Sequence, residues 1–284
     1  MKKPLLFDGA MGTELIKRGV ELPLPVWSAD ANLTHPDIIR DIHSDYIRSG
    51  ANVITTNTFR TTTWTYRKVG FNPSGAKARA RDSLLKAVEL ARSAAGDLVK
   101  VAGSMTSVED CYSPELFPGK SVVEDIYGET TEWFLEAGVD FVLFETMGNI
   151  QEIKIALNIS HAQPVEKWFS LILKDGEYLL DKSLLKDVVK IIRNFSVNCL
   201  LLNCNTIKTS LDGIDHLLED WDGEWGSYPN LGVTDFENDY FEIIDDHKFE
   251  ESMRSILNKN PDVIGTCCGS SPRHVNMLND FIER

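Results

Sequence analysis

Eight short apolar runs, rich in β-branched residues, alternate along this chain with segments of helical periodicity. This alternation is typical of α/β proteins, and eight repeats without a clear break favour a closed (β/α)8 barrel over an open doubly wound sheet. The whole chain, residues 1–284, is therefore predicted to be one barrel domain. The predicted strands are residues 4–8, 52–56, 98–104, 139–145, 168–173, 198–203, 226–232 and 262–267.

Amphipathic segments between these runs predict the helices, most clearly at residues 36–49 and 76–95. Gly50 and Gly138 follow helical patterns, at positions where a C-terminal cap is expected. The seventh run is the weakest of the predicted strands, because Pro229 and two glycines interrupt its pairing capacity.

The charge and hydropathy of the chain exclude two classes of partner. There are 43 acidic residues against 29 Lys and Arg, a net charge of −14, which repels the phosphates of nucleic acid. The longest apolar runs, such as FVLFE and CLLLN, are too short to span a membrane. The apolar start of the chain is interrupted by Asp8 and does not form a signal peptide, so we expect a cytoplasmic protein that acts on small molecules.

Chemistry in a (β/α)8 barrel occurs where strands end, so residues at strand ends are candidates for the site. The first run leads into FDGAMG, in which Asp8 and Gly9 could bind a ligand, or Asp8 could cap the next helix. The second run leads into TTNTF, where Asn57 is a candidate for substrate binding; the alternative for this segment is hydroxyl pairing between strands.

Glu145 ends the fourth run and shares one strand face with Val139, Phe141 and Leu143. A carboxylate at the end of an apolar face needs a partner, because burying an unpaired charge costs free energy. Two partners are possible: a lysine or arginine in a salt bridge, or the ammonium group of a substrate.

The five cysteines, an odd number, argue for free thiols or a metal site rather than a disulfide framework. Cys204 ends the sixth run, and Cys267 and Cys268 end the eighth, so the parity of these strands can bring all three together. Three protein thiolates with one open position are the ligands of a catalytic zinc. Cys199 is expected to pack in the core, and the position of Cys111 fixes no role.

The segments FDGAMGTEL, GANVITTNTF, NCNT and GTCCGSSPRHV together resemble the homocysteine S-methyltransferase family. That family includes betaine- and S-methylmethionine-dependent enzymes and the homocysteine module of cobalamin-dependent methionine synthase. The resemblance runs from Asp8 to Val275, and its most specific part is the cysteine pair together with the upstream NC.

The resemblance implies a (β/α)8 barrel with a zinc ion held by Cys204, Cys267 and Cys268. It also implies that the loop at Asp8 and Gly9 holds the amino-acid end of homocysteine. By the same resemblance Glu145 holds its ammonium group, and Asn230, in the sequence YPN, lies near the second substrate.

The chemistry implied is methyl transfer to the thiol of homocysteine, giving methionine. Zinc would deprotonate the thiol, which is mostly protonated when free at neutral pH. The alternatives are methylation of a different thiol or selenol, or a non-catalytic barrel with a structural zinc closed by a fourth ligand.

The sequence departs from the family where the methyl donor is expected. GSMTSVEDCYSPEL replaces a GPYG-like turn, and Arg60 stands where we align a tyrosine of the betaine enzymes. Because an arginine is a poor neighbour for a quaternary ammonium, a sulfonium such as S-methylmethionine is predicted to be the donor, its carboxylate bound by Arg60. Arg60 could instead pair with a surface carboxylate. The aromatic residues that could line a pocket for the cation are Trp64, Tyr66, Tyr112 and Trp225.

Overall fold

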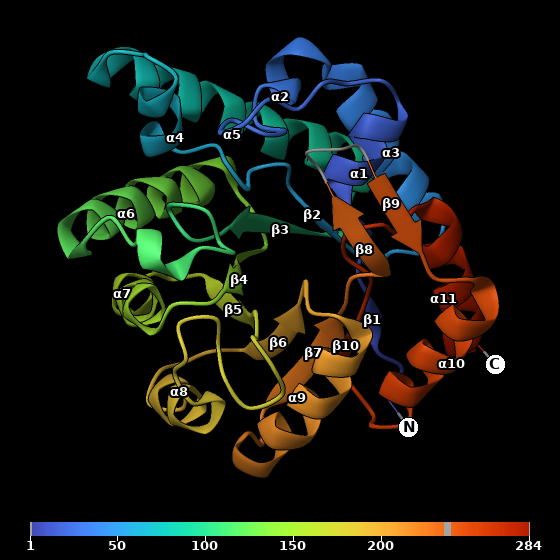
Figure 1. The fold of residues 1–284 in the computed structure, drawn as a ribbon. Helices are drawn as coiled ribbons and strands as arrows, with labels where there is room; N and C mark the ends of the chain where they lie inside the picture. The colour runs from blue at the N-terminus through green and yellow to red at the C-terminus, as the bar shows by residue number, and fades with distance from the viewer. Residues whose placement is uncertain (1, 236–239, 284) are drawn as a thin grey trace.

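Eight parallel strands form the centre of the molecule in the computed structural model, which describes residues 2–235 and 240–283 (Figure 1). In pairing order they are β1 (Leu5–Leu6), β10 (Val263–Ile264), β7 (Glu224–Tyr228), β6 (Cys199–Asn203), β5 (Glu166–Leu171), β4 (Phe141–Met147), β3 (Lys100–Met105) and β2 (Val53–Thr55). Phe7 pairs in parallel with Val53, and the N–H of Asp8 donates to the carbonyl of Val53 at 3.0 Å. These contacts join β1 to β2 and close the barrel, which confirms the predicted (β/α)8 fold.

Helices surround the barrel and connect its successive strands (Figure 1). The predicted helix at 36–49 is confirmed, and the one at 76–95 begins three residues earlier because the side chain of Asn72 caps the N–H of Gly75 at 2.8 Å. Gly138 caps its helix in the left-handed conformation, as predicted. The helices are α1 (Met11–Lys17), α2 (Ala31–Thr34), α3 (Pro36–Arg48), α4 (Thr63–Lys68), α5 (Pro73–Ala95), the 3₁₀ helix η1 (Pro114–Leu116), α6 (Lys120–Ala137), α7 (Ile150–His161), α8 (Leu185–Ile192), α9 (Ile207–Asp220), α10 (Asp246–Leu257) and α11 (Pro272–Glu283).

The predicted seventh strand, residues 226–232, is wrong in its bounds. The barrel strand ends at Tyr228, because Pro229 has no N–H to continue the pairing. After it, β8 (Gly232–Asp235) and β9 (Tyr240–Ile243) form an antiparallel pair outside the barrel, which the sequence pattern did not predict. Gly226 does not weaken the strand: a Cβ there would lie 2.2 Å from the carbonyl oxygen of Val263 in β10, so close pairing requires glycine.

Two further strands differ from the prediction in ways that affect the site. The eighth barrel strand, β10, stops at Ile264, before the cysteines, so both lie in a loop. The fourth, β4, runs on to Met147 with a register shift between Phe144 and Met147, so Glu145 lies inside the strand rather than at its end.

The barrel interior is filled by a cluster of apolar side chains that includes Phe7, Phe141 and Trp168. The rings of Phe141 and Trp168 stack with centroids 4.2 Å apart. Cys199 belongs to this cluster and is fully buried, which confirms its predicted role in packing. A larger apolar cluster fills the layer that includes the helices.

Within the described residues, no helix is both long and apolar enough to cross a membrane.

Candidate metal centre and active site

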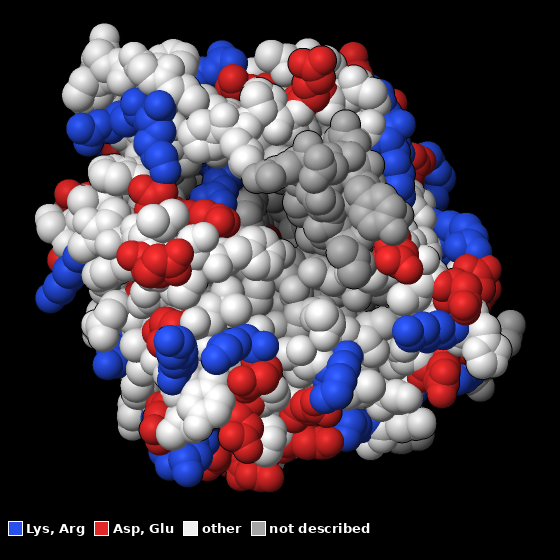
Figure 2. Space-filling view, in the orientation of Figure 1, with Lys and Arg blue, Asp and Glu red and all other residues white. Residues whose placement is uncertain are grey.

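A cavity of about 770 Å³ opens where the barrel strands end, and it is visible as a hollow in Figure 2. Nearly every predicted site residue lines it: Asp8, Gly9, Asn57, Glu145, Cys204, Cys267 and Cys268. Asn230 is the exception and does not line the cavity. The structure thus brings all but one of the predicted site residues to one cavity.

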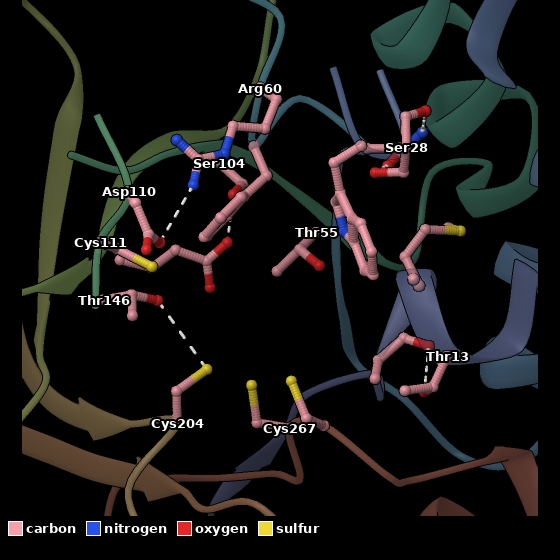
Figure 3. Close-up of a pocket in the computed structure, with 18 of the residues that line it drawn as sticks. Thr13, Ser28, Thr55, Arg60, Ser104, Asp110, Cys111, Thr146, Cys204 and Cys267 are labelled. Atoms are coloured by element: carbon pink, nitrogen blue, oxygen red, sulfur yellow. Dashed lines mark hydrogen bonds and ion pairs between the residues drawn. The ribbon is translucent and has the colours of Figure 1, made fainter. Parts of the chain in front are cut away.

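Cys204, Cys267 and Cys268 form the chemical centre of the cavity. Their sulfur atoms all lie within 4.8 Å of one another, and those of Cys204 and Cys267 point into the same space in Figure 3. The expected convergence of three thiols is therefore confirmed. Cys111 is buried in the cavity wall but lies outside the cluster, and within the described residues no other His, Cys, Asp or Glu joins it.

The backbone after β7 holds the two cysteine loops in place. The carbonyl of Tyr228 accepts a hydrogen bond from the N–H of Cys204 at 3.3 Å, and the carbonyl of Pro229 accepts one from the N–H of Cys267 at 2.8 Å. Because β7 lies between β6 and β10 in the sheet, the chain that leaves it contacts both loops.

Asn230 joins the same two loops through its side chain. Its Nδ2 donates to the carbonyl of Cys204 at 2.9 Å, and its Oδ1 accepts from the N–H of Cys268 at 3.1 Å. With both ends of the amide occupied, Asn230 positions the cysteines, which differs from the substrate contact that the resemblance implied.

Left-handed backbone at Cys204 and Gly269 turns the cysteine loops toward the cavity. Cys204 has φ of 54°, unusual for a residue with a side chain, and Gly269 has φ of +85°. The N–H of Ser270 donates to the carbonyl of Cys267 at 3.1 Å, which closes a tight turn around the cysteine pair.

The surroundings shift the pKa values of the cysteine thiols in different directions. Hydrogen bonds from Cys204 and Cys267 lower the pKa of the Cys268 thiol well below its usual value. The hydrogen bonds that Cys267 makes to Cys204 and Cys268, together with burial, raise the pKa of its own thiol. Three thiolates this close together repel one another, so ionisation of all three requires a cation between them.

The geometry of the cluster fits a zinc ion. Sulfur atoms around a tetrahedral zinc lie about 3.8 Å apart, for Zn–S bonds of about 2.3 Å, and the cluster is compact enough for that arrangement. Three ligands facing a cavity leave a fourth position for another sulfur.

Two carboxyl groups, Asp8 and Glu145, face the same cavity. Glu145 accepts hydrogen bonds from the hydroxyls of Ser104 and Tyr228, and burial raises its pKa to about 7. Burial raises the pKa of Asp8 well above its usual value, although the N–H of Thr55 donates to it at 2.8 Å. Within the described residues neither carboxyl has a lysine or arginine partner, so the structure does not support the alternative in which Glu145 forms a salt bridge.

The loop at Asp8 and Gly9 is packed against the second cysteine loop. Helix α1 has no side-chain N-cap, so the alternative in which Asp8 caps it is wrong. A Cβ on Gly9 would lie 2.5 Å from Oγ of Ser270, and the N–H of Ala10 donates to that oxygen at 2.9 Å. Glycine is required here for the close approach of these two loops.

The side chain of Asn57 also has protein partners. Its Oδ1 accepts from the hydroxyl of Ser28 at 2.6 Å, and its Nδ2 donates to the carbonyl of Ser28 and to Oδ1 of Asn32. Asn57 thus fastens residues 28–32 to the end of β2. The neighbouring hydroxyls of Thr56 and Thr58 bond to the backbone of β3, which supports the structural interpretation of TTNTF.

Charged residues lie at the outer part of the cavity. Arg60 donates to the carbonyl of Glu109 at 2.6 Å and pairs with Asp110 at 3.6 Å, as Figure 3 shows. Arg60 therefore lines the cavity and has a carboxylate partner as well, and its proposed contact with the donor stays a prediction. Of the four aromatic candidates only Tyr112 lines the cavity, whereas Trp27 and Phe59, which do line it, were not predicted.

Comparisons with known proteins agree with this geometry. Residues 5–282 match the family model for homocysteine S-methyltransferase. The homocysteine S-methyltransferase of Escherichia coli is 30% identical, over 96% of this chain and 94% of that protein. The crystal structure of the metallated form of homocysteine methyltransferase MmuM from Escherichia coli superposes with a TM-score of 0.86 and 27% identity, covering 99% of this chain and 96% of that one. A selenocysteine methyltransferase of Astragalus bisulcatus is 26% identical over 93% of this chain and 88% of that protein.

The chain belongs to the homocysteine S-methyltransferase family. It is accordingly an enzyme of the methyltransferase class, with a TIM-barrel fold. The residues that support the cysteines were not predicted from the sequence; they are chiefly Thr146, Asn203 and Ser270. The amide of Asn203, in NCNT, was the only sequence signal for them.

The position of Asn230 predicts a stability defect rather than a substrate-binding defect. Asn230→Ala removes a partner from the Cys204 carbonyl and from the Cys268 N–H, which should cost about 2 kcal/mol of unfolding free energy. Urea unfolding measures that loss, and kinetics measure the KM for each substrate. An unchanged unfolding midpoint together with a raised KM for one substrate would show that Asn230 contacts substrate instead.

Proposed function

We propose that this protein transfers a methyl group from a sulfonium donor, such as S-methylmethionine, to the thiol of homocysteine, giving methionine. The observation that carries the proposal is the cluster of three thiols in a cavity that is also lined by the carboxyls of Asp8 and Glu145. Residues 1–284 would act as one homocysteine-binding barrel, although residues 1, 236–239 and 284 lie outside the described part. Free thiols suit a reducing compartment such as the cytoplasm.

Zinc is the proposed metal, with Cys204, Cys267 and Cys268 as its ligands. An all-sulfur ligand set favours zinc over magnesium or calcium, which prefer oxygen. A bound zinc would supply a deprotonated, nucleophilic substrate sulfur at neutral pH. Three ligands beside an open cavity support a catalytic site over the closed four-ligand site of a structural zinc.

The two carboxyls are proposed to hold the amino-acid end of homocysteine. An ammonium group between Asp8 and Glu145 would relieve the unfavourable burial that raises the pKa of both. The hydroxyls of Ser104 and Tyr228 fix the orientation of the Glu145 carboxyl, so the amino-acid end is held at a constant distance from the cysteines.

The methyl transfer itself needs no general base on the protein. The thiol proton of homocysteine is released to solvent on binding, and a lone pair of its sulfur forms the new bond to the methyl carbon. The bond from that carbon to the sulfonium sulfur breaks, and its electron pair remains on the departing sulfur as a neutral thioether. The role of the barrel is to align the two substrates for in-line attack.

The metal proposal predicts one zinc per chain, lost when a ligand is removed. Cys204→Ala and Cys268→Ala should each bind substantially less zinc than the wild type when measured by elemental analysis. Cys199→Ala is the matched control, because this cysteine is buried in the barrel core and should leave the zinc content unchanged. Full zinc retention in both ligand variants would refute the assignment.

Glu145→Gln should weaken homocysteine far more than 4-mercaptobutanoate, which has the same thiol and carboxylate but no amino group. A charge-assisted hydrogen bond contributes roughly 1.5–3 kcal/mol, a change of about ten- to a hundredfold in kcat/KM. Glu152→Gln serves as the control, because Glu152 is buried but does not line the cavity. Equal losses for the two thiols would assign Glu145 a structural role.

The charged outer cavity predicts the choice of donor. Arg60 and Asp110 offer a cation and an anion to a zwitterionic amino acid, whereas a quaternary ammonium favours aromatic surroundings without a cation. S-methylmethionine should exceed betaine in kcat/KM by about tenfold or more, and Arg60→Tyr should narrow that difference. Methionine formation from homocysteine with each donor is the assay. Betaine turnover at or above that of S-methylmethionine in the wild type would contradict the prediction.

A further inference from the structure

Two residues with side chains adopt the left-handed backbone conformation beside each other at the thiol cluster. Thr146 has φ of 59° and Cys204 has φ of 54°. For Thr146 this is costly, because its β-branched side chain crowds the backbone there. Such a backbone conformation persists only where surrounding contacts enforce it. The contacts of Thr146 therefore indicate the function for which this conformation is kept.

The side-chain amide of Asn203 enforces this arrangement. Asn203 is fully buried at the end of β6. Its Oδ1 accepts hydrogen bonds from the N–H of Thr146 at 2.9 Å and from the hydroxyl of Ser170 at 2.7 Å. A backbone N–H can only donate, so the oxygen of this amide must face Thr146 N and its nitrogen must face the other way.

The orientation of the amide directs two donors at one sulfur atom. Nδ2 of Asn203 lies 2.9 Å from Oγ1 of Thr146 and 3.4 Å from Sγ of Cys204. Since the amide nitrogen only donates, Oγ1 of Thr146 accepts from it, and the hydroxyl hydrogen of Thr146 is free for Sγ of Cys204, 3.9 Å away. Figure 3 shows Thr146 and Cys204 facing each other.

The three cysteines are therefore not equivalent. Within the described residues, Cys204 is the one cysteine of the cluster whose sulfur receives hydrogen bonds from side chains other than cysteine. Hydrogen bonds to a thiolate withdraw negative charge from it and fix its direction, and the outer contacts of a metal ligand tune the metal in this way.

We propose that Thr146 and Asn203 are positioning residues that hold the Cys204 sulfur and reduce its negative charge relative to Cys267 and Cys268. The inference rests on the proposed metal site. Its chemical benefit is selectivity, because a methyl donor in this cavity meets the sulfurs of the protein as well as that of the substrate. A thiolate that shares its charge with two donors is a poorer nucleophile, so Cys204 is protected from methylation.

Cobalt-substituted protein tests the inference without turnover, through the sulfur-to-cobalt charge-transfer band. Thr146→Val keeps the branched shape and removes the hydroxyl, so the band should move to longer wavelength, and zinc affinity should fall about ten- to a hundredfold. Thr146→Ser restores the hydroxyl and should match the wild type. Asn203→Asp, which keeps the accepting oxygen and loses the donating nitrogen, should move the band in the same direction as Thr146→Val.

The matched control is Thr56→Val. Thr56 is a buried threonine after β2 whose hydroxyl bonds to the backbone of β3 and to Thr58, not to a cysteine, so its loss should leave the band in place. If the wild type shows the band but Thr146→Val does not shift it, or if Thr56→Val shifts it equally, the inference is overturned while the metal site stands. Absence of any thiolate–cobalt band in the wild type overturns the metal site and the inference together.

Discussion

The site depends on the hydrogen bonds that residues 228–231 make to both cysteine loops. Besides the bonds to the N–H groups of Cys204 and Cys267, the N–H of Leu231 donates to the carbonyl of Cys268 at 3.0 Å. No sequence-local interaction can bring Cys204 to Cys267, which is 63 residues further along the chain. The strand order of the barrel places β7 between their two strands, and the backbone leaving β7 then fixes the distance between the loops. Residues 228–231 thus set the relative positions of the three cysteines.

Around that segment, the polar residues of the rim divide into two groups according to their partners. Asn57, Asn203 and Asn230 use their amide groups on the protein, where each joins segments distant in sequence. Asp8 and Glu145 have hydroxyl and N–H donors but, within the described residues, no cationic partner. Because a buried amide is satisfied by neutral partners and a buried carboxylate is not, the amides build the site and the carboxyls remain available for substrate.

The sequence predicted those features that follow from periodicity and failed for those that depend on a single tertiary contact. Two-residue alternation correctly placed Phe141 and Leu143 in the barrel interior and Glu145 toward the cavity. The register shift after Phe144, which turns Thr146 toward Cys204, leaves no periodic signal. The roles of Asn57 and Asn230 could not be predicted either, because an amide is satisfied equally well by a substrate or by a carbonyl that arrives from another loop.

The electrostatics of the cavity favour the proposed combination of a metal, an amino acid and a sulfonium in one site. Three thiols and two carboxyls share the cavity, and the pKa values of Asp8, Glu145 and Cys267 are raised, so ionisation of all five groups is unfavourable without cations. Each proposed component brings a positive charge: the metal to the thiols, the ammonium to the carboxyls, and the sulfonium to the space between. When the methyl group is transferred, the sulfonium charge disappears and the substrate thiolate becomes a neutral thioether. The departing thioether would then interact more weakly with the anionic cavity than the sulfonium did, and the methylated sulfur would interact more weakly with the proposed metal than the thiolate did. The electrostatics that favour binding of the proposed reactants would thus also favour release of the products.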